Sequence, residues 1–343
     1  MNTLRLKSHG QRVRPEYAAP DGEIGWAGTS TNETRPDGQT SGIVTRYQKH
    51  QSTYSRPQVL GWIKAIYPGA IEYTSMTKEM RGYAFAMGVM FAGVFIFGAF
   101  LTGRLTIWAE GATISADPFL ASAIILELLI GIFFLVFFLR FDLFRPADLP
   151  IIFDRKHKKV FRILREEQPG PLGAFKPWPI DVCEYDWNLV DAEHQSTVFT
   201  TGGTMRRDHY LMFIVRKSED DPTIIDSFQI GSSMDLDAER VDAMWEHIRR
   251  FMEEQGPHLP KGEERLADLR QPESWWQSMG AVGLLGPNYF QHWRELPVVT
   301  LALHLTFPAT IPFLLLWGTG NWLSYKTAIP VQWPEEVVRA VQG

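Results

Sequence analysis

Two ionisable side chains, Glu127 and His304, lie inside long apolar stretches of the sequence. An acidic residue near the middle of a membrane-spanning helix costs about 2.5–3.5 kcal/mol on insertion scales, so its presence needs a physical reason. Either the Glu127 carboxyl group belongs to a proton or ion path, or it is protonated or hydrogen-bonded where helices pack. One carboxylate alone makes no path across a bilayer, and we therefore favour the packing role.

The rest of the sequence offers few groups for chemistry. The patterns HExxH and GxSxG and the glycine-rich phosphate-binding motifs are absent, and the one cysteine, Cys183, excludes a CxxC metal site. We therefore expect no enzyme, no cofactor and no metal site. The net charge of −5 argues against a nucleic-acid partner.

Three apolar stretches predict membrane segments. The 22 residues from Gly82 to Gly103 carry no charge, and the 22 residues from Pro118 to Leu139 carry only that of Glu127. A helix of 22 residues is about 33 Å long, enough to cross a hydrocarbon core. The short connection from Arg104 to Asp117 predicts that residues 81–140 form an antiparallel helical hairpin.

Small residues recur at four-residue spacing along both of these spans. They are Ala84, Gly88 and Ala92 in the first span, and Ala123 and Gly131 on the face of Glu127 in the second. Small side chains at this spacing let helices approach closely. We expect these faces to pack the hairpin, and the spans could also join two copies of the chain.

Basic residues flank the hairpin on its outer sides. The connecting loop holds only Arg104, whereas the flanks hold Lys64, Lys78 and Arg81 before the first span and Arg140, Arg145, Arg155, Lys156, Lys158, Lys159, Arg162 and Arg165 after the second. Since cytoplasmic flanks are enriched in Lys and Arg, the N-terminus and the region after the hairpin are predicted to be cytoplasmic.

The third apolar stretch, residues 296–325, is interrupted by Pro308 and Pro312, which predict a kink or a break. Two complete crossings need about 40 residues, so 30 residues form either one kinked span or a re-entrant pair. We favour one span, which would place the tail at 326–343 outside. The Trp-rich residues 261–295 precede it, and Trp293 and Trp317 are spaced to mark the two interfaces of one helix.

The polar residues 1–58 have no helical or strand periodicity, and we expect a tail that is disordered or ordered only by a partner. Residues 59–80 are expected to be a juxtamembrane segment. Within it Val59 to Tyr67 predicts a short helix, either packed or interfacial, that ends before Pro68-Gly69.

Residues 141–260 are predicted to form a cytoplasmic α+β domain. Six strand-like stretches are followed by an amphipathic helix from Asp235 to Gln255; the stretches are 151–153, 160–164, 182–187, 196–201, 210–217 and 223–230. Six strands closed by one C-terminal helix are similar to a pleckstrin-homology-like barrel, an analogy of fold that implies no ligand.

Four basic residues, Arg155, Lys156, Lys158 and Lys159, occupy the turn between the first two strands. They could contact anionic lipid headgroups or a partner close to the second span. A solvated turn that only enforces the topology explains them equally well.

The helix of this domain also carries a sequence resemblance. The stretch from Trp245 to Pro260, which includes Ile248, Arg249, Arg250, Met252, Gly256 and Pro257, resembles a signature of proteobacterial inner-membrane proteins with an uncharacterised domain. The resemblance extends to the hairpin around Ile152–Arg162 and to the closing Ile329–Val337. Genes of such proteins often lie beside type VI secretion components and toxins, which implies a multi-pass protein of the bacterial inner membrane.

Two classes of function follow. The resemblance implies a membrane-anchored binding protein, such as an immunity or accessory protein, whose partner is a cognate toxin or another secretion-system protein. The alternative is a membrane-acting toxin or small channel in which Glu127 and His304 line the path. Expression separates the two hypotheses, because a pore former depolarises the cells that make it.

Overall fold

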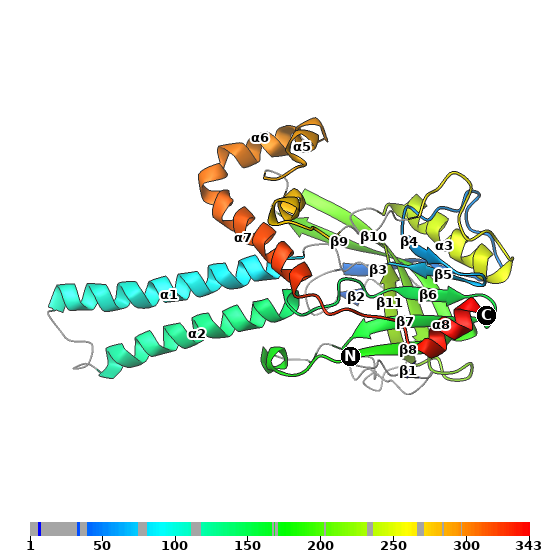
Figure 1. Ribbon diagram of the computed structural model, residues 1–343, viewed down its shortest axis with the longest axis horizontal. Coiled ribbons are helices and arrows are strands. Elements are labelled where there is room, and N and C mark those ends of the chain that lie inside the picture. The colour runs from blue at the N-terminus through cyan, green and yellow to red at the C-terminus, as the bar shows by residue number, and fades with distance from the viewer. Residues whose placement is uncertain are drawn as a thin grey trace.

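The computed structural model describes residues 6–7, 33–34, 40–74, 81–110, 118–166, 168, 171–201, 204–231, 236–265, 271–282, 285–295 and 297–343. In this part of the chain, a long helical hairpin projects from a domain built of β-sheets and helices (Figure 1). A bent pair of helices, α6 and α7, lies beside the base of the hairpin.

The hairpin consists of α1 (Tyr83–Glu110) and α2 (Pro118–Asp142), and both helices are long and apolar enough to cross a membrane. Many of their large side chains are exposed, among them Phe97 at 60% and Leu129 at 58%, as expected of surfaces that meet lipid. The two helices are therefore held together by what lies on their facing sides.

Glycine and alanine make this contact close. A Cβ atom on Gly88 would lie 2.7 Å from the Cβ atom of Phe138, and one on Gly131 would lie 3.2 Å from that of Phe95. Ala92 is 4% exposed and lies against Gly131. Ala84 and Ala123, the other members of the predicted packing faces, are half-buried.

The first sheet is a six-stranded sheet in the order β1-β8-β7-β6-β5-β4. Its strands are antiparallel except for the short β1, which pairs in parallel with β8. The bounds are β1 Leu6–Lys7, β4 Ile63–Ile66, β5 Ala70–Tyr73, β6 Ile151–Asp154, β7 Lys159–Arg165 and β8 Ile180–Asp186.

The second sheet has five strands in the order β11-β10-β9-β3-β2, all antiparallel. The bounds are β2 Glu33–Thr34, β3 Thr40–Tyr47, β9 Val190–Thr201, β10 Thr204–Arg216 and β11 Ile224–Ile230. A 3₁₀ turn, Trp187–Leu189, leads the chain from β8 in the first sheet to β9 in the second.

One core joins the two sheets and helix α3 (Ala238–Glu253). Trp187 and Trp245 are fully buried in it, with ring centroids 6.2 Å apart. Phe153 from the first sheet and Phe213 from the second meet at 5.5 Å. The domain is therefore a mixed, sheet-rich structure whose helix packs into the core shared by both sheets.

The hairpin is inserted between two neighbouring strands of one sheet. β5 precedes α1, β6 follows α2, and the two strands pair antiparallel with Tyr73 opposite Ile151. The chain thus leaves the sheet, runs through both long helices and returns beside its point of departure (Figure 1).

The six stretches predicted as strands all form strands, β6 to β11, and the predicted helix is α3. These strands divide between two sheets, and earlier strands that the sequence did not predict extend both of them.

Those earlier strands correct the predicted N-terminal organisation. Residues 40–58 are not a loose tail, since β3 pairs with β9 and Tyr47 is buried against Trp245. The predicted helix from Val59 to Tyr67 is instead β4 with the start of a turn at Pro68-Gly69, closed by the Tyr67 N–H donating to the Ala70 carbonyl at 2.9 Å. A Pro-Gly turn favours a β-hairpin, and this outweighs the apolar spacing of a few residues.

The third apolar stretch is divided into α6 (Pro297–Leu305) and α7 (Phe307–Lys326), which are bent by 115°. The break coincides with Thr306, two residues before Pro308, while α7 continues through Pro312. Short helices α4 (Trp275–Ser278) and α5 (Tyr289–Glu295) precede it. Trp293 and Trp317 therefore do not mark the two ends of one straight helix, as the spacing had suggested.

After α7 the chain returns to the domain. Helix α8 (Glu335–Gln342) packs on the six-stranded sheet, where Val337 and Val341 are 1% and 3% exposed beside Ile152 and Phe161. The favoured single span would have placed residues 326–343 across the bilayer from this sheet. The packing of α8 contradicts that position of the tail.

Candidate functional site

Helix α3 carries the motif on which the resemblance rests. Asp237 caps its first turn, because its carboxylate accepts from the Arg240 N–H at 2.8 Å. Trp245, Ile248 and Met252 are fully buried at helical spacing, as the apolar stripe of the sequence predicted.

The helix ends through Gln255. This residue adopts a φ of +56°, the left-handed region, and the Gly256 N–H then donates back to the Arg250 carbonyl at 2.8 Å. A Cβ atom on Gly256 would lie 3.0 Å from Arg250, so glycine suits this position. The Pro257 carbonyl accepts from Nε2 of the buried His247 at 3.2 Å, which ties the segment after the helix to α3.

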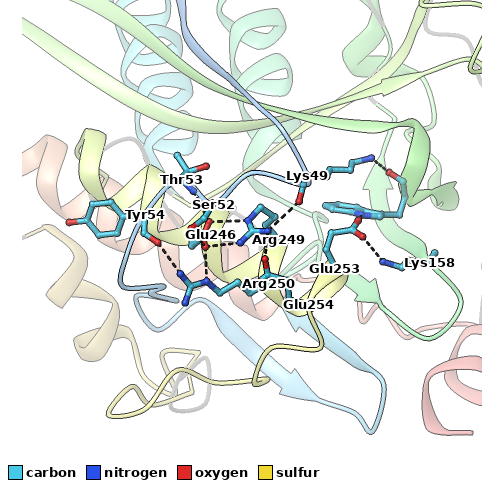
Figure 2. A network of polar contacts seen from close by, with 11 residues as sticks. Lys49, Ser52, Thr53, Tyr54, Lys158, Glu246, Arg249, Arg250, Glu253 and Glu254 are labelled. Atoms are coloured by element: carbon cyan, nitrogen blue, oxygen red, sulfur yellow. Dashed lines mark hydrogen bonds and ion pairs between the residues drawn. The ribbon is translucent and has the colours of Figure 1, made fainter.

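A buried carboxylate, Glu246, is the centre of the polar network on α3 (Figure 2). Arg249 donates to both of its oxygens, at 2.8 and 3.0 Å, and Arg250 donates at 2.6 Å. The Ser52 hydroxyl and the Thr53 backbone N–H complete the set, at 2.8 and 3.0 Å. Glu246 is thus bound from its own helix and from the segment that follows β3.

These contacts determine the charge state of the pair. Burial opposes ionisation of Glu246, but the bonds from Arg249, Thr53, Ser52 and Arg250 outweigh it and lower the pKa of Glu246 to about 2. The same contact with Glu246 raises the pKa of the Arg249 guanidinium, which also donates to Glu254 at 2.7 Å. Both side chains are therefore ionised and mutually compensated in the domain interior.

A second group of contacts continues the network toward the first sheet. Lys49 lies 4.7 Å above the Trp187 ring and donates to the Trp187 carbonyl, and burial lowers the pKa of Lys49 to about 8. The Trp187 indole N–H donates to Glu253, which also accepts from Lys158 at 2.9 Å. The network therefore joins residues 49–54, α3 and the β6–β7 turn (Figure 2).

The network stabilises the contacts between parts of the domain, and the Glu246 carboxylate at its centre has no oxygen left for a ligand. Every oxygen of Glu246 is engaged by protein donors, and a saturated buried ion pair acts as a positioning contact. Among the residues that the structure describes, no group of three or more His, Cys, Asp or Glu side chains could hold a metal ion. The motif residues Arg249 and Arg250 are thus placed as structural ligands of Glu246.

The predicted basic cluster lies on the β6–β7 turn, at the end of the strands remote from the hairpin (Figure 1). Its members bind other parts of the domain: Arg155 donates to the Gly256 carbonyl, Lys156 to the Gly343 carbonyl, Lys158 to Glu253 and Lys159 to Glu184. The expectation that the turn lies close to the second span was wrong, because β6 runs away from the end of α2.

Three helices meet at the base of the hairpin instead. Asp142, at the end of α2, accepts from the backbone N–H groups of Gly82 and Phe85 at 2.9 and 2.7 Å, and so caps α1. The Arg81 carbonyl accepts from Trp317 and Asn321 of α7, each at 3.1 Å. These hydrogen bonds connect α1, α2 and α7 tightly at the base of the hairpin.

Close backbone contact is part of this junction. Gly82 has a φ of +88°, and a Cβ atom there would lie 2.2 Å from the Asn321 nitrogen. A Cβ atom on Gly320 would lie 2.7 Å from the Gly82 carbonyl. The fully buried Arg81 side chain donates to the Pro146 carbonyl at 2.6 Å and lies 4.4 Å from the Tyr325 ring. No side chain larger than hydrogen fits at either glycine without displacing α7.

Glu127 and His304, the two ionisable residues of the predicted membrane segments, contact different neighbours. The Glu127 carboxyl group faces Gly98 of α1, where a Cβ atom would lie 3.7 Å from Oε2, and that oxygen is buried without a hydrogen-bond partner in the described part of the chain. His304 instead binds the Thr300 carbonyl at 2.7 Å and the Tyr289 hydroxyl at 3.2 Å.

Sequence reasoning missed Glu246, Lys49 and Asp142. The spacing of Glu246 to Arg249 and Arg250, three and four residues, is a signal of helical ion pairs that could have drawn attention to Glu246. No local signal exists for Lys49, because its partner lies far away in the chain. Asp142 has a local partner in Arg145, three residues further on at 3.7 Å, but the backbone N–H groups that it caps lie far away in the chain.

The fold and these contacts define a protein with a sheet-rich domain into which two helices, long and apolar enough to cross a membrane, are inserted. The family model of a family of unknown function, DUF6708, matches residues 128–342, and the chain belongs to this family. The matched region begins within α2 and includes both the α3 motif and α8. The chain matches no curated protein and no solved structure.

Proposed function

We propose that this protein is a membrane-anchored binding protein that holds its sheet-rich domain at one face of the bilayer and binds a protein partner there. The observation that supports the proposal is the pairing of Tyr73 with Ile151, which roots both ends of the hairpin in one sheet. An anchor inserted between paired strands fixes the domain close to the lipid, whereas a flexible linker would let it move away.

The partner that we propose is a cognate toxin or another component of a type VI secretion system, which makes the chain an immunity or accessory protein. The support for this partner is the sequence resemblance in the stretch from Trp245 to Pro260. Since Arg249, Arg250 and Gly256 of that stretch lie within the domain, the motif maintains the fold that presents the binding surface.

Co-expression with the product of the neighbouring gene tests the proposal. An immunity protein is harmless alone and restores growth of cells that make its toxin, and it co-purifies with that toxin in detergent. Growth arrest by this chain alone, or no rescue of cells that make any neighbouring effector, would contradict it.

The second candidate is a small channel or membrane-acting toxin, and the unpartnered Oε2 of Glu127 favours it. A carboxylate at this depth with an oxygen to spare could exchange protons if a second copy lined a path beside it. Depolarisation of cells that express the chain alone would support this function and contradict the first one.

We further propose that the domain lies on the cytoplasmic side of a bacterial inner membrane. The basic flanks of the hairpin support that side. The packing of α8 on the sheet supports a re-entrant arrangement of α6 and α7, which leave the domain side and return to it.

A pleckstrin-homology-like arrangement of the domain is also proposed. It is supported by the meander from β5 to β8, the three strands β9 to β11 and the closing helix α3, with the hairpin inserted in the first connection.

A further inference from the structure

The loop between β7 and β8 lies against the domain end of α2. Its short 3₁₀ turn, Pro171–Phe175, carries two exposed apolar side chains, Leu172 at 66% and Phe175 at 54%. The Phe175 ring lies 6.0 Å from that of Phe133 in α2. Two exposed large apolar residues on a turn that touches a membrane span are expected to be in contact with lipid.

The position of Phe133 in α2 gives the depth of this turn. Phe133 precedes Arg140 by seven residues, about 10 Å along a helix. The Phe175 ring therefore reaches the level of Phe133, among the acyl chains. The Lys176 carbonyl, which follows it, accepts from the Arg140 guanidinium group at 3.4 Å, near the level of the headgroups.

At that level two guanidinium groups are held over one indole ring. The Arg140 and Arg165 guanidinium carbons lie 5.1 and 4.3 Å from the centre of the Trp178 ring. Trp178 is itself fixed, since its indole N–H donates to the Gly173 carbonyl at 2.9 Å and its ring contacts Phe141 at 5.2 Å. Arg165 also donates to the Arg140 carbonyl at 2.9 Å, which links β7 to the end of α2.

The chemistry of this cluster suits a phosphate. A guanidinium group stacked on an aromatic ring keeps N–H donors in its plane, and these donors match the geometry of phosphate oxygens. Lys176, exposed next to Phe175, adds a third cation. Glu166 and Glu167 follow Arg165 in the chain, so binding depends on the placement of the cations rather than on net charge.

We propose that Arg140, Arg165 and Lys176 form a binding site for the phosphate of an anionic phospholipid, with Leu172 and Phe175 inserted among its acyl chains. The site is independent of the partner proposed above. It lies at the opposite end of β7 from the basic turn that the sequence had suggested for lipid contact.

Lipid binding to the full-length protein in detergent tests this site. Native mass spectrometry would measure retention of phosphatidylglycerol and phosphatidylcholine, with phosphatidylglycerol expected to be retained more strongly. Changing Arg140→Gln together with Arg165→Gln should lower phosphatidylglycerol retention about tenfold, to the level of phosphatidylcholine. The matched control is Arg155→Gln, which removes a guanidinium group that lies 4.7 Å from an aromatic ring, Phe251, remote from the hairpin.

Two further measurements make the outcome decisive. Phe175→Ser leaves all three cations in place and should also weaken phosphatidylglycerol retention, while its thermal unfolding stays unchanged. If the double variant unfolds, the two single variants should each show part of the loss. Equal retention of the two lipids, full retention by the folded variants, or displacement of phosphatidylglycerol by millimolar inorganic phosphate would overturn the proposal.

Discussion

Tyr73 and Ile151 face each other in neighbouring antiparallel strands, although the entire helical hairpin lies between them in the chain. A sheet cannot form across a bilayer, so the residues before α1 and after α2 must lie on the same side of the membrane. The hairpin therefore crosses an even number of times, a conclusion that agrees with the distribution of basic residues but does not depend on it.

The first prediction concerns this topology. A reporter that is active only in the cytoplasm should be active when it is fused after Arg165, and one that is active only outside should be active when inserted near Gly111, which lies outside the described residues. If the fusion after Arg165 reported the outside and the insertion near Gly111 reported the cytoplasm, the hairpin would have the opposite orientation. Activity of the two on one side would show that it does not cross.

The second prediction concerns the C-terminus. Because Val337 and Val341 pack on the six-stranded sheet, a reporter fused after Gly343 should report the same compartment as the fusion after Arg165. A cysteine introduced at Thr306, in the bend between α6 and α7, should be poorly labelled by a membrane-impermeant maleimide from either side. If the two fusions reported opposite compartments, α6 and α7 would form a single kinked span that crosses the membrane once.

The sequence predicted those elements whose signals are local. Six strands, helix α3 and the two long apolar helices follow from patterns within continuous stretches of the sequence, and all of them form. Residues 40–58 were misjudged because β3 is ordered by pairing with β9, a contact between distant parts of the chain that composition does not reveal. The prediction that the basic turn lies close to the second span was wrong for a related reason. The position of the turn depends on the direction in which β6 runs from the end of α2, and the sequence does not reveal that direction.

The candidate site shows the same division. Arg249, Arg250 and Gly256 were named from the motif, and the helical spacing of Glu246 to the two arginines is a local signal that was overlooked. The bonds that Glu246 accepts from Ser52 and Thr53, by contrast, depend on tertiary packing. Pairing of this kind cannot be derived from one sequence unless both partners lie within one helical turn.

The third prediction concerns the buried ion pair. Glu246→Gln leaves Arg249, which is 1% exposed, without its anion and should lower the free energy of unfolding by about 3 kcal/mol. Since the pKa of Glu246 falls from 4.5 to about 2 on folding, its contribution is present above pH 4.5 and is lost as pH falls toward 2.

Denaturant unfolding between pH 7 and pH 3 measures both effects. The wild type should lose stability steeply below pH 4.5, and Glu246→Gln should lack this part of the loss. Glu239→Gln, at an exposed position of the same helix, is the control and should change stability by less than about 0.5 kcal/mol. An equally small effect of Glu246→Gln would show that the pair is not needed for stability.

The fourth prediction concerns Trp245. Its fully buried ring stacks on Tyr47 at 5.3 Å and lies near Trp187, so Trp245→Ala should cost about 3–5 kcal/mol and lower protein abundance without changing membrane insertion. Trp276→Ala, at a side chain that is 55% exposed, is the matched control and should leave abundance unchanged. A fully abundant Trp245→Ala protein that no longer binds its partner would instead assign Trp245 to the binding surface.

The fifth prediction concerns Glu127 and separates the two proposed functions. The carboxyl group faces Gly98 with one oxygen unpartnered, and Glu127→Gln keeps its size and hydrogen-bonding capacity while removing its proton equilibrium. If the residue serves packing, the glutamine variant should keep full protective function, whereas Glu127→Leu alters the contact with α1.

Measuring the membrane potential of cells that express the wild type or Glu127→Gln distinguishes the channel from the binding protein. A channel whose working part is the carboxylate depolarises these cells in its wild-type form and fails to do so as the glutamine variant. Gly98→Ala, whose added methyl group would lie at ordinary contact distance from Glu127, controls for small changes of packing at the same place. We expect no depolarisation by any of the three proteins, because one carboxylate per hairpin lies against a neighbouring helix and is connected to no second ionisable group in the described spans.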